Sequence, residues 1–426
     1  MASYKKIRKI EDESMKVRVV ERLLQLRQQL NKEVPERTAT QTLLLATWNI
    51  REFGKNRERE SLYYIAEIID HFDIVVIQEV NSKELDGLDG VLDILGDNWS
   101  YVMSDGVDGP AGGNEAMAFV YNTNKVKFTG LAGEIVLPDG KNMKAVQFAR
   151  TPFMVSFRAG WFDFKLCTVH IYYGKNTEKG IVKRRLKEIE TVSDFLLKRQ
   201  KSDDMSYILL GDFNIPDVDG VYYNALVEKR YTTPKGKEKS KEKFYIPEEI
   251  RQHPTDLGKV SHYDQIAFSL KLDRSMVLYD NGKQKAGAFN FTNSVYKPED
   301  WEVYKPIFQE KYDGTIENEK IAFAKAIAKY KAAKEKSDKE WKKYEEVRAK
   351  YEKELEEFKK TKQGTRPTAP DKPKKAPTEP NTTHTTPEEY FTRTWRTFEM
   401  SDHLPLWVEL KIDFSDQYLK KQKTAE

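Results

Sequence analysis

Short apolar runs alternate with amphipathic segments along most of the chain. The runs are rich in β-branched and aromatic residues and are bounded by Gly, Asp, Asn or Pro, as strands are. Strands are predicted over residues 43–48, 74–77, 116–121, 153–157, 164–169, 207–210, 265–269 and 406–410. Between them, residues 60–71 and 181–198 carry apolar side chains at helical spacing. This mixture predicts an α/β fold in which sheets are covered by helices.

An amphipathic helix is predicted ahead of the first strand. Met15, Val19, Leu23 and Leu30 recur at helical spacing with charged residues between them, and Pro35 follows. We expect this helix to pack on the body of the protein, with a dimer contact as the alternative.

The composition changes near residue 317, and Ala, Lys and Glu dominate to about residue 360. Aromatic and aliphatic residues share one three–four spacing there, interrupted at Lys334, Ser337 and Arg348. One long helix or a helical hairpin with coiled-coil character is predicted. Prolines among Lys and Thr follow over residues 364–380, which predicts an extended polyproline-like linker.

These changes divide the chain into four parts. We expect an N-terminal helix and arm (1–40), a catalytic domain (41–303 with 390–414), an inserted helical segment with its linker (304–389) and a charged tail (415–426). Apolar residues make up 39% of the 426 residues, which is enough for a sizeable core.

Composition says more about the compartment in which the protein is expected than about its function. Lys plus Arg number 72 against 68 for Asp plus Glu, and this small excess fits a polyanionic partner without predicting one. Cys167 is the one cysteine, so no intrachain disulfide can form and a reducing compartment is expected. No apolar run is long enough to cross a bilayer, and residues 1–13 lack the apolar core of a secretory signal. A soluble, cytoplasmic protein without membrane contact is expected.

Polar residues of unusual kinds stand at the ends of the predicted strands. A single one would be read more simply as a turn residue. A whole series at successive strand boundaries predicts one active site, because strand ends are where a rigid scaffold presents catalytic groups. The series is Asn49, Glu79, His170, Asp212, Asn214, Asp264, Asp402 and His403.

The motifs around these residues resemble those of the endonuclease/exonuclease/phosphatase superfamily, and most of all its deoxyribonuclease I-like members. The motifs are Thr47-Trp48-Asn49-Ile50, Ile77-Gln78-Glu79-Val80, Asn114-Glu115, Arg150-Thr151-Pro152, Thr168-Val169-His170, Gly211-Asp212-Phe213-Asn214, Tyr263-Asp264-Gln265 and Ser401-Asp402-His403. The resemblance implies a four-layer α/β sandwich of two packed sheets flanked by helices. The N-terminal helix and the long inserted helix would be additions to it.

The resemblance also implies a divalent-metal-dependent phosphodiesterase, first of all an endonuclease acting on DNA. A divalent cation offsets the charge that develops on the phosphoryl oxygens. Glu79, Asn49 and Asp402 are the implied ligands, and Mg²⁺ is the implied ion because it prefers oxygen ligands. Mn²⁺ or Ca²⁺ could substitute or assist.

The implied catalytic groups include two histidine–acid pairs, because a carboxylate fixes the orientation of an imidazole and stabilises its charged form. Asp212, held with Asn214, would align or deprotonate the attacking water. Which group acts as base and which protonates the leaving oxygen stays open. The implied set is His170 with Glu115, His403 with Asp264, Asp212 and Asn214, and Arg150 as the contact to a substrate phosphate.

Two positions depart from the deoxyribonuclease I-like pattern. Asn81 and Gly113 stand where Arg and Tyr residues contact the DNA minor groove in that group. Two alternatives therefore remain: a phosphatase or phosphodiesterase acting on an inositol phosphate, a lipid headgroup or a nucleotide, and a non-catalytic binding scaffold. Inositol-phosphatase relatives carry a Trp-Cys-Asp-Arg type motif where this chain has residues 262–265, and no catalytic residue is visibly lost.

Two segments are candidates for contacts with partners. Lys183, Arg184, Arg185 and Lys187 form a basic cluster on the helix after His170. A solvated helix face is expected there, with a contact to a phosphate backbone as the alternative. Residues 317–360 are expected either to contact a partner, the substrate or a second copy, or to pack their apolar seam on the host domain.

Overall fold

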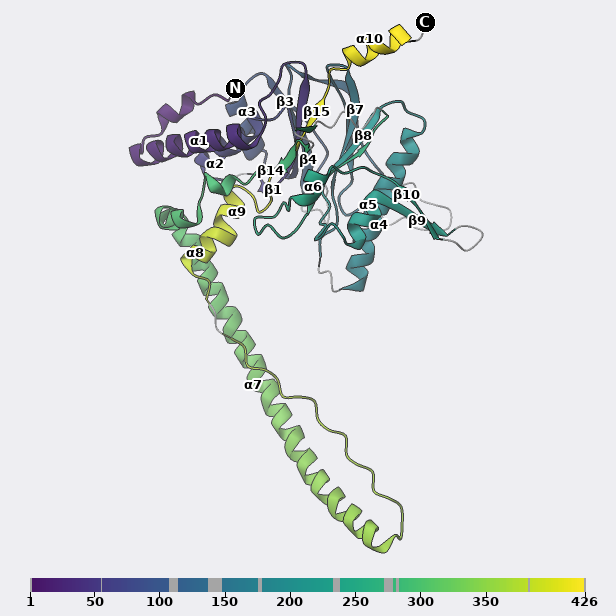
Figure 1. Cartoon of the computed structure of the whole chain (residues 1–426). Coiled ribbons are helices and arrows are strands. Elements are labelled where there is room, and N and C mark those ends of the chain that lie inside the picture. Colours follow the sequence, from purple (N-terminus) through teal and green to yellow (C-terminus); the bar gives the residue numbers. More distant parts are fainter. Residues whose placement is uncertain are drawn as a thin grey trace. The chain divides into compact units, whose positions relative to one another are not determined.

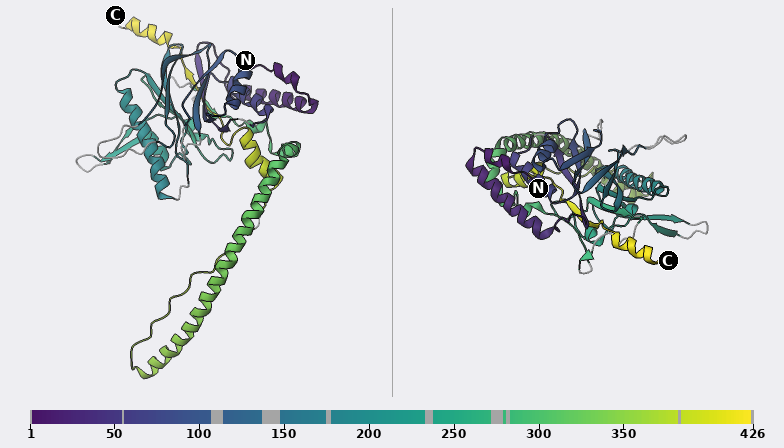
Figure 2. Two further views of the ribbon diagram at one scale, coloured as in Figure 1. Left: turned by 180° about the vertical axis from the view of Figure 1, so that it is seen from behind. Right: turned by 90° about the horizontal axis from the view of Figure 1, so that it is seen from above.

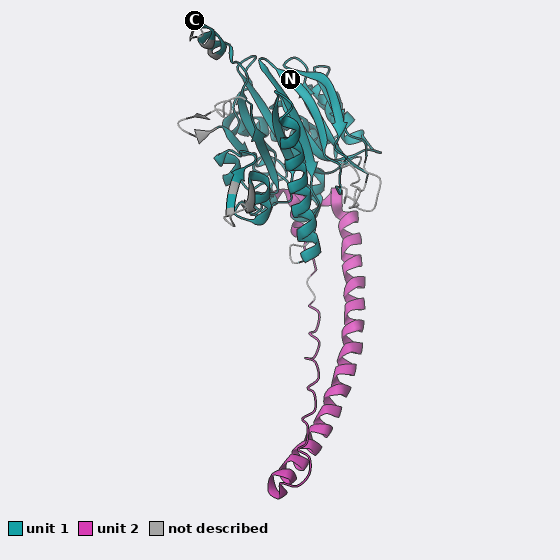
Figure 3. Cartoon of the chain, turned by 90° about the vertical axis from the view of Figure 1, so that its right-hand side faces the viewer, with its two compact units in different colours: residues 1–298, 393–426 teal, residues 299–392 magenta. Residues whose placement is uncertain are grey.

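The computed structural model describes residues 2–54, 56–106, 114–136, 148–174, 178–232, 238–271, 279–280, 283–381 and 384–424. The chain divides into two compact units, which Figure 3 shows in different colours. Unit 1 comprises Met1–Pro298 and Arg393–Glu426, and unit 2 comprises Glu299–Thr392.

Unit 1 is built on two β-sheets. In Figures 1 and 2 the strands of one sheet are seen next to those of the other. The six-stranded sheet has the order β14 (Ala286–Ala288), β15 (Leu406–Lys411), β1 (Thr42–Phe53), β2 (Ile74–Asn81), β4 (Glu115–Asn122), β3 (Trp99–Met103). The five-stranded sheet has the order β11 (Asp264–Ser269), β8 (Ser206–Asp212), β7 (Phe162–His170), β6 (Phe153–Ala159), β5 (Val126–Glu134). The pairs β1·β2 and β7·β8 are parallel, and the other pairs within these two sheets are antiparallel.

The core lies between the two sheets. Leu45 and Val76 of the six-stranded sheet are fully buried in the same cluster as Val155 and Leu166 of the five-stranded sheet. Aromatic rings join the faces, with the Phe119 and Phe153 centroids 5.7 Å apart. Alternate residues of each strand supply this interface, as the pleat of a strand requires.

Helices cover the outer faces of both sheets. On the side of the six-stranded sheet, α1 (Glu13–Glu33) packs on α2 (Arg59–Asp70), and α2 packs on α3 (Asp86–Leu95). On the other side, α4 (Lys179–Gln200) packs on β8 and on α5 (Val221–Val227). The expected four-layer sandwich is confirmed, and so is the packing of the N-terminal helix on the body. The remaining elements are short: η1 (Lys5–Lys9), β9 (Glu228–Thr232), β10 (Glu238–Glu242), α6 (Glu248–Gln252), β12 (Tyr279–Asp280), β13 (Lys283–Gln284), η3 (Phe291–Asn293), η4 (Pro298–Asp300), α8 (Pro387–Tyr390), η5 (Phe391–Trp395), α9 (Arg396–Glu399) and α10 (Ser415–Thr424).

Unit 2 consists mainly of α7 (Trp301–Thr361), a helix of 61 residues. At about 1.5 Å per residue it is roughly 90 Å long. It begins 16 residues before the helix expected from the sequence, and its first turns bury Tyr304 and Phe308. These two rings lie against Phe391 and Tyr390, with centroids 5.7 and 5.5 Å apart.

The Pro-rich segment after α7 makes contacts with the helix. Pro367, Pro370, Pro373, Pro377 and Pro380 are each half-buried, and the residues between them are exposed. The indole Nε1 of Trp341 on α7 donates a hydrogen bond to the Lys374 carbonyl at 3.2 Å, and Tyr312 Oη donates to the Thr385 carbonyl at 3.1 Å. The extended segment therefore runs back along the helix and covers part of the apolar seam.

In the described part of the chain, no helix is long and apolar enough to span a membrane.

Candidate active site

Strand ends from both sheets meet at one place in unit 1. Asn49 lies on β1 and Asp212 ends β8 in the opposite sheet. The Asn49 amide joins the sheets, because its Nδ2 donates to Glu79 Oε1 at 2.9 Å and to Asp212 Oδ2 at 3.1 Å. The strand register places His170 and Asp264 on either side of Asp212. The fold thus brings together side chains that are up to 215 residues apart in the sequence.

The backbone bends where the six-stranded sheet reaches this centre. The pairing of β2 with β4 shifts register between Ile77 and Val80, and Glu79 has φ +62°. Glu52 also has a positive φ, of 47°, and its amide donates to Glu79 Oε2 at 3.0 Å. A positive φ at a residue with a Cβ costs about 1–2 kcal/mol. The surrounding structure therefore holds the Glu79 carboxylate in place against a local conformational cost.

A second bend follows β8. Gly211 has φ +127°, and a Cβ there would lie 2.2 Å from the Val169 carbonyl, so only glycine fits. Asn214 has φ +53° and donates from Nδ2 to the Ile171 carbonyl at 2.8 Å. Its amide N–H donates to Asp212 Oδ1 at 2.8 Å. The Gly-Asp-Phe-Asn motif therefore fixes one oxygen of Asp212 and leaves Oδ2 toward the centre.

His170 is buried and faces two carboxylates. Its Nδ1 lies 3.1 Å from Glu115 Oε2, an ion-pair distance without hydrogen-bond alignment, and its Nε2 lies 3.5 Å from Asp212 Oδ2. Burial lowers the pKa of His170, but Glu115 and Asp212 outweigh it and the pKa is raised. Arg150 also pairs with Glu115, through Nε and through Nη2 at 2.9 Å to Oε1. Burial raises the pKa of Glu115, yet His170 and Arg150 together lower it to about 2.

His403 forms the second pair, with Asp264. Nδ1 of His403 lies 2.7 Å from Asp264 Oδ2, and Nε2 lies 3.9 Å from Asp212 Oδ2. Burial lowers the pKa of His403, but Asp264 and Asp212 raise it well above its usual value. The neighbouring acids therefore favour the charged form of both imidazoles, and the buried Asp212 carboxylate lies between them.

Most of the residues expected to act together lie together. Asn49, Glu79, Glu115, His170, Asp212, Asn214, Asp264 and His403 are joined by the contacts above, and Arg150 enters through Glu115 rather than as an isolated cation. Asp402 is exposed, and its carboxylate makes no hydrogen bond or ion pair with the residues that the structure describes. Gly113 lies outside the described residues. Asn81 closes a turn, since its Oδ1 accepts from the Lys83 amide at 3.0 Å.

Two groupings could hold a divalent ion. Asp212, Asp264 and His403 offer ligand atoms within 4.8 Å of one another. In that group His403 Nδ1 and Asp264 Oδ2 already face each other at 2.7 Å, which occupies one nitrogen of the imidazole and one oxygen of the carboxylate. Asn49 Oδ1 is buried and has no hydrogen-bond partner among the described residues, and it belongs to the amide that also binds Glu79. A carbonyl oxygen beside a carboxylate suits a hard cation, so Asn49 and Glu79 are the better fit.

Helix α4 contributes two residues that the sequence reasoning did not assign to the site. Arg185 is 2% exposed and donates to the carbonyls of Tyr172, Gly174 and Asn214. Glu188 accepts from the amides of Ala149 and Tyr172, at 3.1 Å each. The expectation of a solvated basic face is wrong for Arg185. The sequence signal that could have identified these two residues is their spacing of three, which places Arg185 and Glu188 on the same, buried side of the helix.

Comparison of the sequence with known proteins identifies a family and several relatives. Residues 46–277 match the sequence profile of the Endonuclease/Exonuclease/phosphatase family. Deoxyribonuclease-1 of Rattus norvegicus is 28% identical over 181 residues, which cover 41% of this chain and 60% of that protein. Deoxyribonuclease-1 of Equus caballus is 28% identical over 184 residues, with 41% and 61% covered. The chain thus spans about three-fifths of the length of these curated relatives.

Three solved structures match this chain at low sequence identity. A mannosyl-6-phosphatase of Bacteroides thetaiotaomicron is 18% identical, with 53% of this chain and 85% of that chain covered and a TM-score of 0.36. The human Nocturnin catalytic domain is 17% identical, with 54% and 83% covered and a TM-score of 0.36. A truncated Caenorhabditis elegans TDP2 is 14% identical, with 55% and 85% covered and a TM-score of 0.37.

Proposed function

Because the chain belongs to the endonuclease/exonuclease/phosphatase family, we propose that it is a divalent-metal-dependent phosphodiesterase that cuts nucleic acid, with internal cleavage of DNA as the leading reaction. One observation carries the proposal. The buried Asp212 carboxylate lies between two imidazoles, and each imidazole is backed by a second acid. Such an arrangement suits attack of water on a phosphodiester, which needs a proton acceptor and stabilised negative charge in one place.

Asp212 has the position of the group that orients and deprotonates the attacking water. Its Oδ1 accepts from the Asn214 amide and its Oδ2 accepts from Asn49 Nδ2, so the second lone pair of Oδ2 would take the proton of the water. The water oxygen bonds to phosphorus, the bond to the leaving oxygen breaks, and that oxygen takes a proton. His170 or His403, in its charged form, would donate that proton. The products are one phosphomonoester end and one hydroxyl end.

The remaining groups hold the phosphate. A divalent cation, when bound, offsets the negative charge on the phosphoryl oxygens. Glu79 and the Asn49 carbonyl would hold it, with Asp402 as the third candidate ligand. Nε and Nη2 of Arg150 donate to Glu115, so Nη1 is the nitrogen that would donate to a phosphoryl oxygen.

The test uses supercoiled plasmid, linear duplex, RNA and a small phosphodiester, each with Mg²⁺ and with chelator. Metal-dependent nicking is expected, and Asp212→Asn or His403→Gln should lower the rate about 10²- to 10⁴-fold. Asp163→Asn is the matched control, since Asp163 lies on the same sheet and pairs with Arg158 on the surface.

The outcome also separates the alternative. Asn81 closes a turn in place of a groove-contacting residue, which favours a smaller phosphoester as the second candidate substrate. Turnover of a sugar or nucleotide phosphomonoester without cleavage of any nucleic acid would move the assignment there. Full activity in Asp212→Asn would contradict the site itself.

A further inference from the structure

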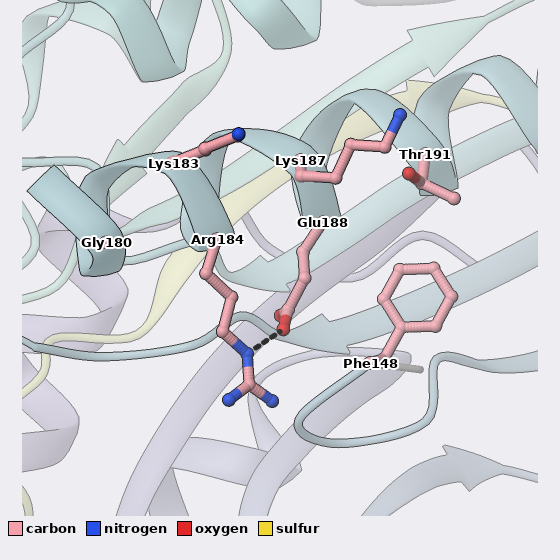
Figure 4. A pocket seen from close by; sticks show the side chains of 7 residues that line it. All are labelled: Phe148, Gly180, Lys183, Arg184, Lys187, Glu188 and Thr191. Atoms are coloured by element: carbon pink, nitrogen blue, oxygen red, sulfur yellow. Dashed lines mark hydrogen bonds and ion pairs between the residues drawn. The ribbon is translucent and has the colours of Figure 1, made fainter. Parts of the chain in front are cut away.

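A pocket of about 320 Å³ lies beside α4, apart from the histidine–aspartate centre. Phe148 and Thr191 line it together with four charged residues of the helix: Lys183, Arg184, Lys187 and Glu188. Figure 4 shows these side chains on successive turns of α4, with Phe148 facing the helix. The volume falls within the range of small-ligand sites.

The wall of the pocket is mostly apolar, and three of the residues that line it are cationic. Lys183 and Lys187 are exposed and pair with no acid in the described part of the chain. Nε of Arg184 donates to Glu188 Oε1 at 3.3 Å, which leaves its terminal amino groups to other acceptors. Three cations thus stand against one carboxylate. That carboxylate is buried and accepts two backbone hydrogen bonds, and burial raises the pKa of Glu188.

Glu188 also ties the pocket to the catalytic centre. It accepts from the Ala149 amide, and the next residue, Arg150, pairs with Glu115 beside His170. It accepts as well from the Tyr172 amide, two residues after His170. The Arg184 guanidinium lies 4.2 Å from the centroid of the Tyr172 ring. The pocket is therefore joined by direct contacts to the two segments that carry Arg150 and His170.

We propose that this pocket, here called the α4 pocket, binds a non-scissile phosphate of the substrate strand through Lys183, Arg184 and Lys187. The inference rests on the proposed nuclease function and names the surface that grips the polymer. Contacts to phosphates position a strand without reading its sequence. They would bind the polymer in place of the groove contact that Asn81 does not make. They would also favour polynucleotides over small phosphodiesters as substrates.

The test compares Lys183→Ala/Lys187→Ala with Lys198→Ala/Lys201→Ala. Lys198 lies in the last turn of the same helix and Lys201 follows its end; both are exposed, and the pair removes the same charge. Binding of a fluorescein-labelled oligonucleotide is measured by anisotropy in the Asp212→Asn background, so that cleavage does not interfere. The ratio of kcat/KM for the oligonucleotide to that for the small phosphodiester is measured in the active protein.

The α4 pocket variant should bind the oligonucleotide about five- to thirty-fold more weakly than the control pair. The slope of log affinity against log salt should fall by about 0.7–0.9, since one phosphate contact is lost. The kcat/KM ratio should fall by a similar factor. Equal affinities and equal salt slopes in the two pairs would overturn the proposal, whether or not the wild type cleaves.

A competition arm separates a polymer from a free ligand. If the α4 pocket variant loses affinity for AMP or inorganic phosphate but keeps its affinity for the oligonucleotide, the pocket serves a free phosphate compound and the proposal fails. Absence of metal-dependent cleavage of any substrate by the wild type would instead refute the proposed function. In that case, weaker oligonucleotide binding by the variant would still support the phosphate contact.

Discussion

Arg185 holds two catalytic segments in place from the buried side of α4. Its guanidinium donates to the carbonyls of Tyr172 at 2.9 Å, Gly174 at 2.8 Å and Asn214 at 3.0 Å. The first two lie just after His170, and the third belongs to the motif that fixes Asp212. The guanidinium also lies 5.0 Å from the centroid of Tyr222. We expect Arg185 to act as a positioning residue, without touching the substrate.

Arg185→Lys is the informative change because it keeps the charge and most of the stem. An ammonium is a point donor and cannot spread over three carbonyls as a planar guanidinium does. A hydrogen bond from a charged donor contributes about 1.5–3 kcal/mol, so losing one or two should lower the free energy of unfolding by about 2–4 kcal/mol. Displacement of catalytic groups by about 1 Å can cost 10²-fold in rate. We expect kcat to fall about 10- to 100-fold with a much smaller change in KM.

The measurement pairs urea unfolding with kcat and KM on the small phosphodiester, under conditions where the variant is fully folded. Arg158→Lys is the control, because Arg158 makes a two-point pair with Asp163 on the exposed surface and should show no measurable effect. An unchanged kcat in folded Arg185→Lys would reduce Arg185 to a purely structural role. An unchanged unfolding free energy would contradict the energetic reading of its three hydrogen bonds.

Two further predictions concern parts of the chain away from the reacting atoms. Glu399 is fully buried; burial raises its pKa to about 7, against the lowering effect of hydrogen bonds from Ser61 and Glu58. A raised carboxyl pKa means that stability is highest below the unfolded-state value near 4.5 and is lost as pH rises to about 7. Glu399→Gln should therefore gain roughly 2–3 kcal/mol over the wild type at pH 8 relative to pH 5. Denaturant unfolding at both pH values checks this, and an equal difference at the two would refute it. In unit 2, Trp341→Ala removes the hydrogen bond to the Lys374 carbonyl and the contact with Lys372, whose Nζ lies 5.6 Å from the indole centroid. Trypsin should cut residues 364–380 about five- to tenfold faster, because cleavage follows the open population. The exposed Val347→Ala is the control, and an unchanged cutting rate in Trp341→Ala would mean that the Pro-rich segment is not held by this contact.

The sequence predicted the strands and most of the residues at their ends, for a physical reason. A buried strand must be apolar, so an Asp or His at its end is conspicuous, and residues such as Asp212 and His403 could be named in advance. Arg185 could not, because helical periodicity treats a charged side chain as facing solvent. The pairing of Arg150 with Glu115 was also missed, since nothing local to either motif reports contact between segments 35 residues apart.

Two strands that were not predicted show weak periodicity. Strand β5 is mostly exposed and contains Gly130 and Gly133, so it shows little of the alternation by which strands are recognised. Strand β14 has only three residues. The start of α7 was placed too late because Pro306 and Gly314 lie within it, and both are usual markers of helix ends.

The aromatic contacts of Tyr304 and Phe308 with Phe391 and Tyr390 mean that the chain enters and leaves unit 2 at neighbouring points. The helix rises about 1.5 Å per residue, whereas a polyproline-like return advances about 3.1 Å per residue. Growth or shrinkage of such a hairpin is constrained by this ratio. Insertions that survive in descendants of this chain should come in compensated pairs, with about two residues added to the helix for each residue added to the return. A change in the length of the helix alone, or of the return alone, would leave part of the other segment without its contacts.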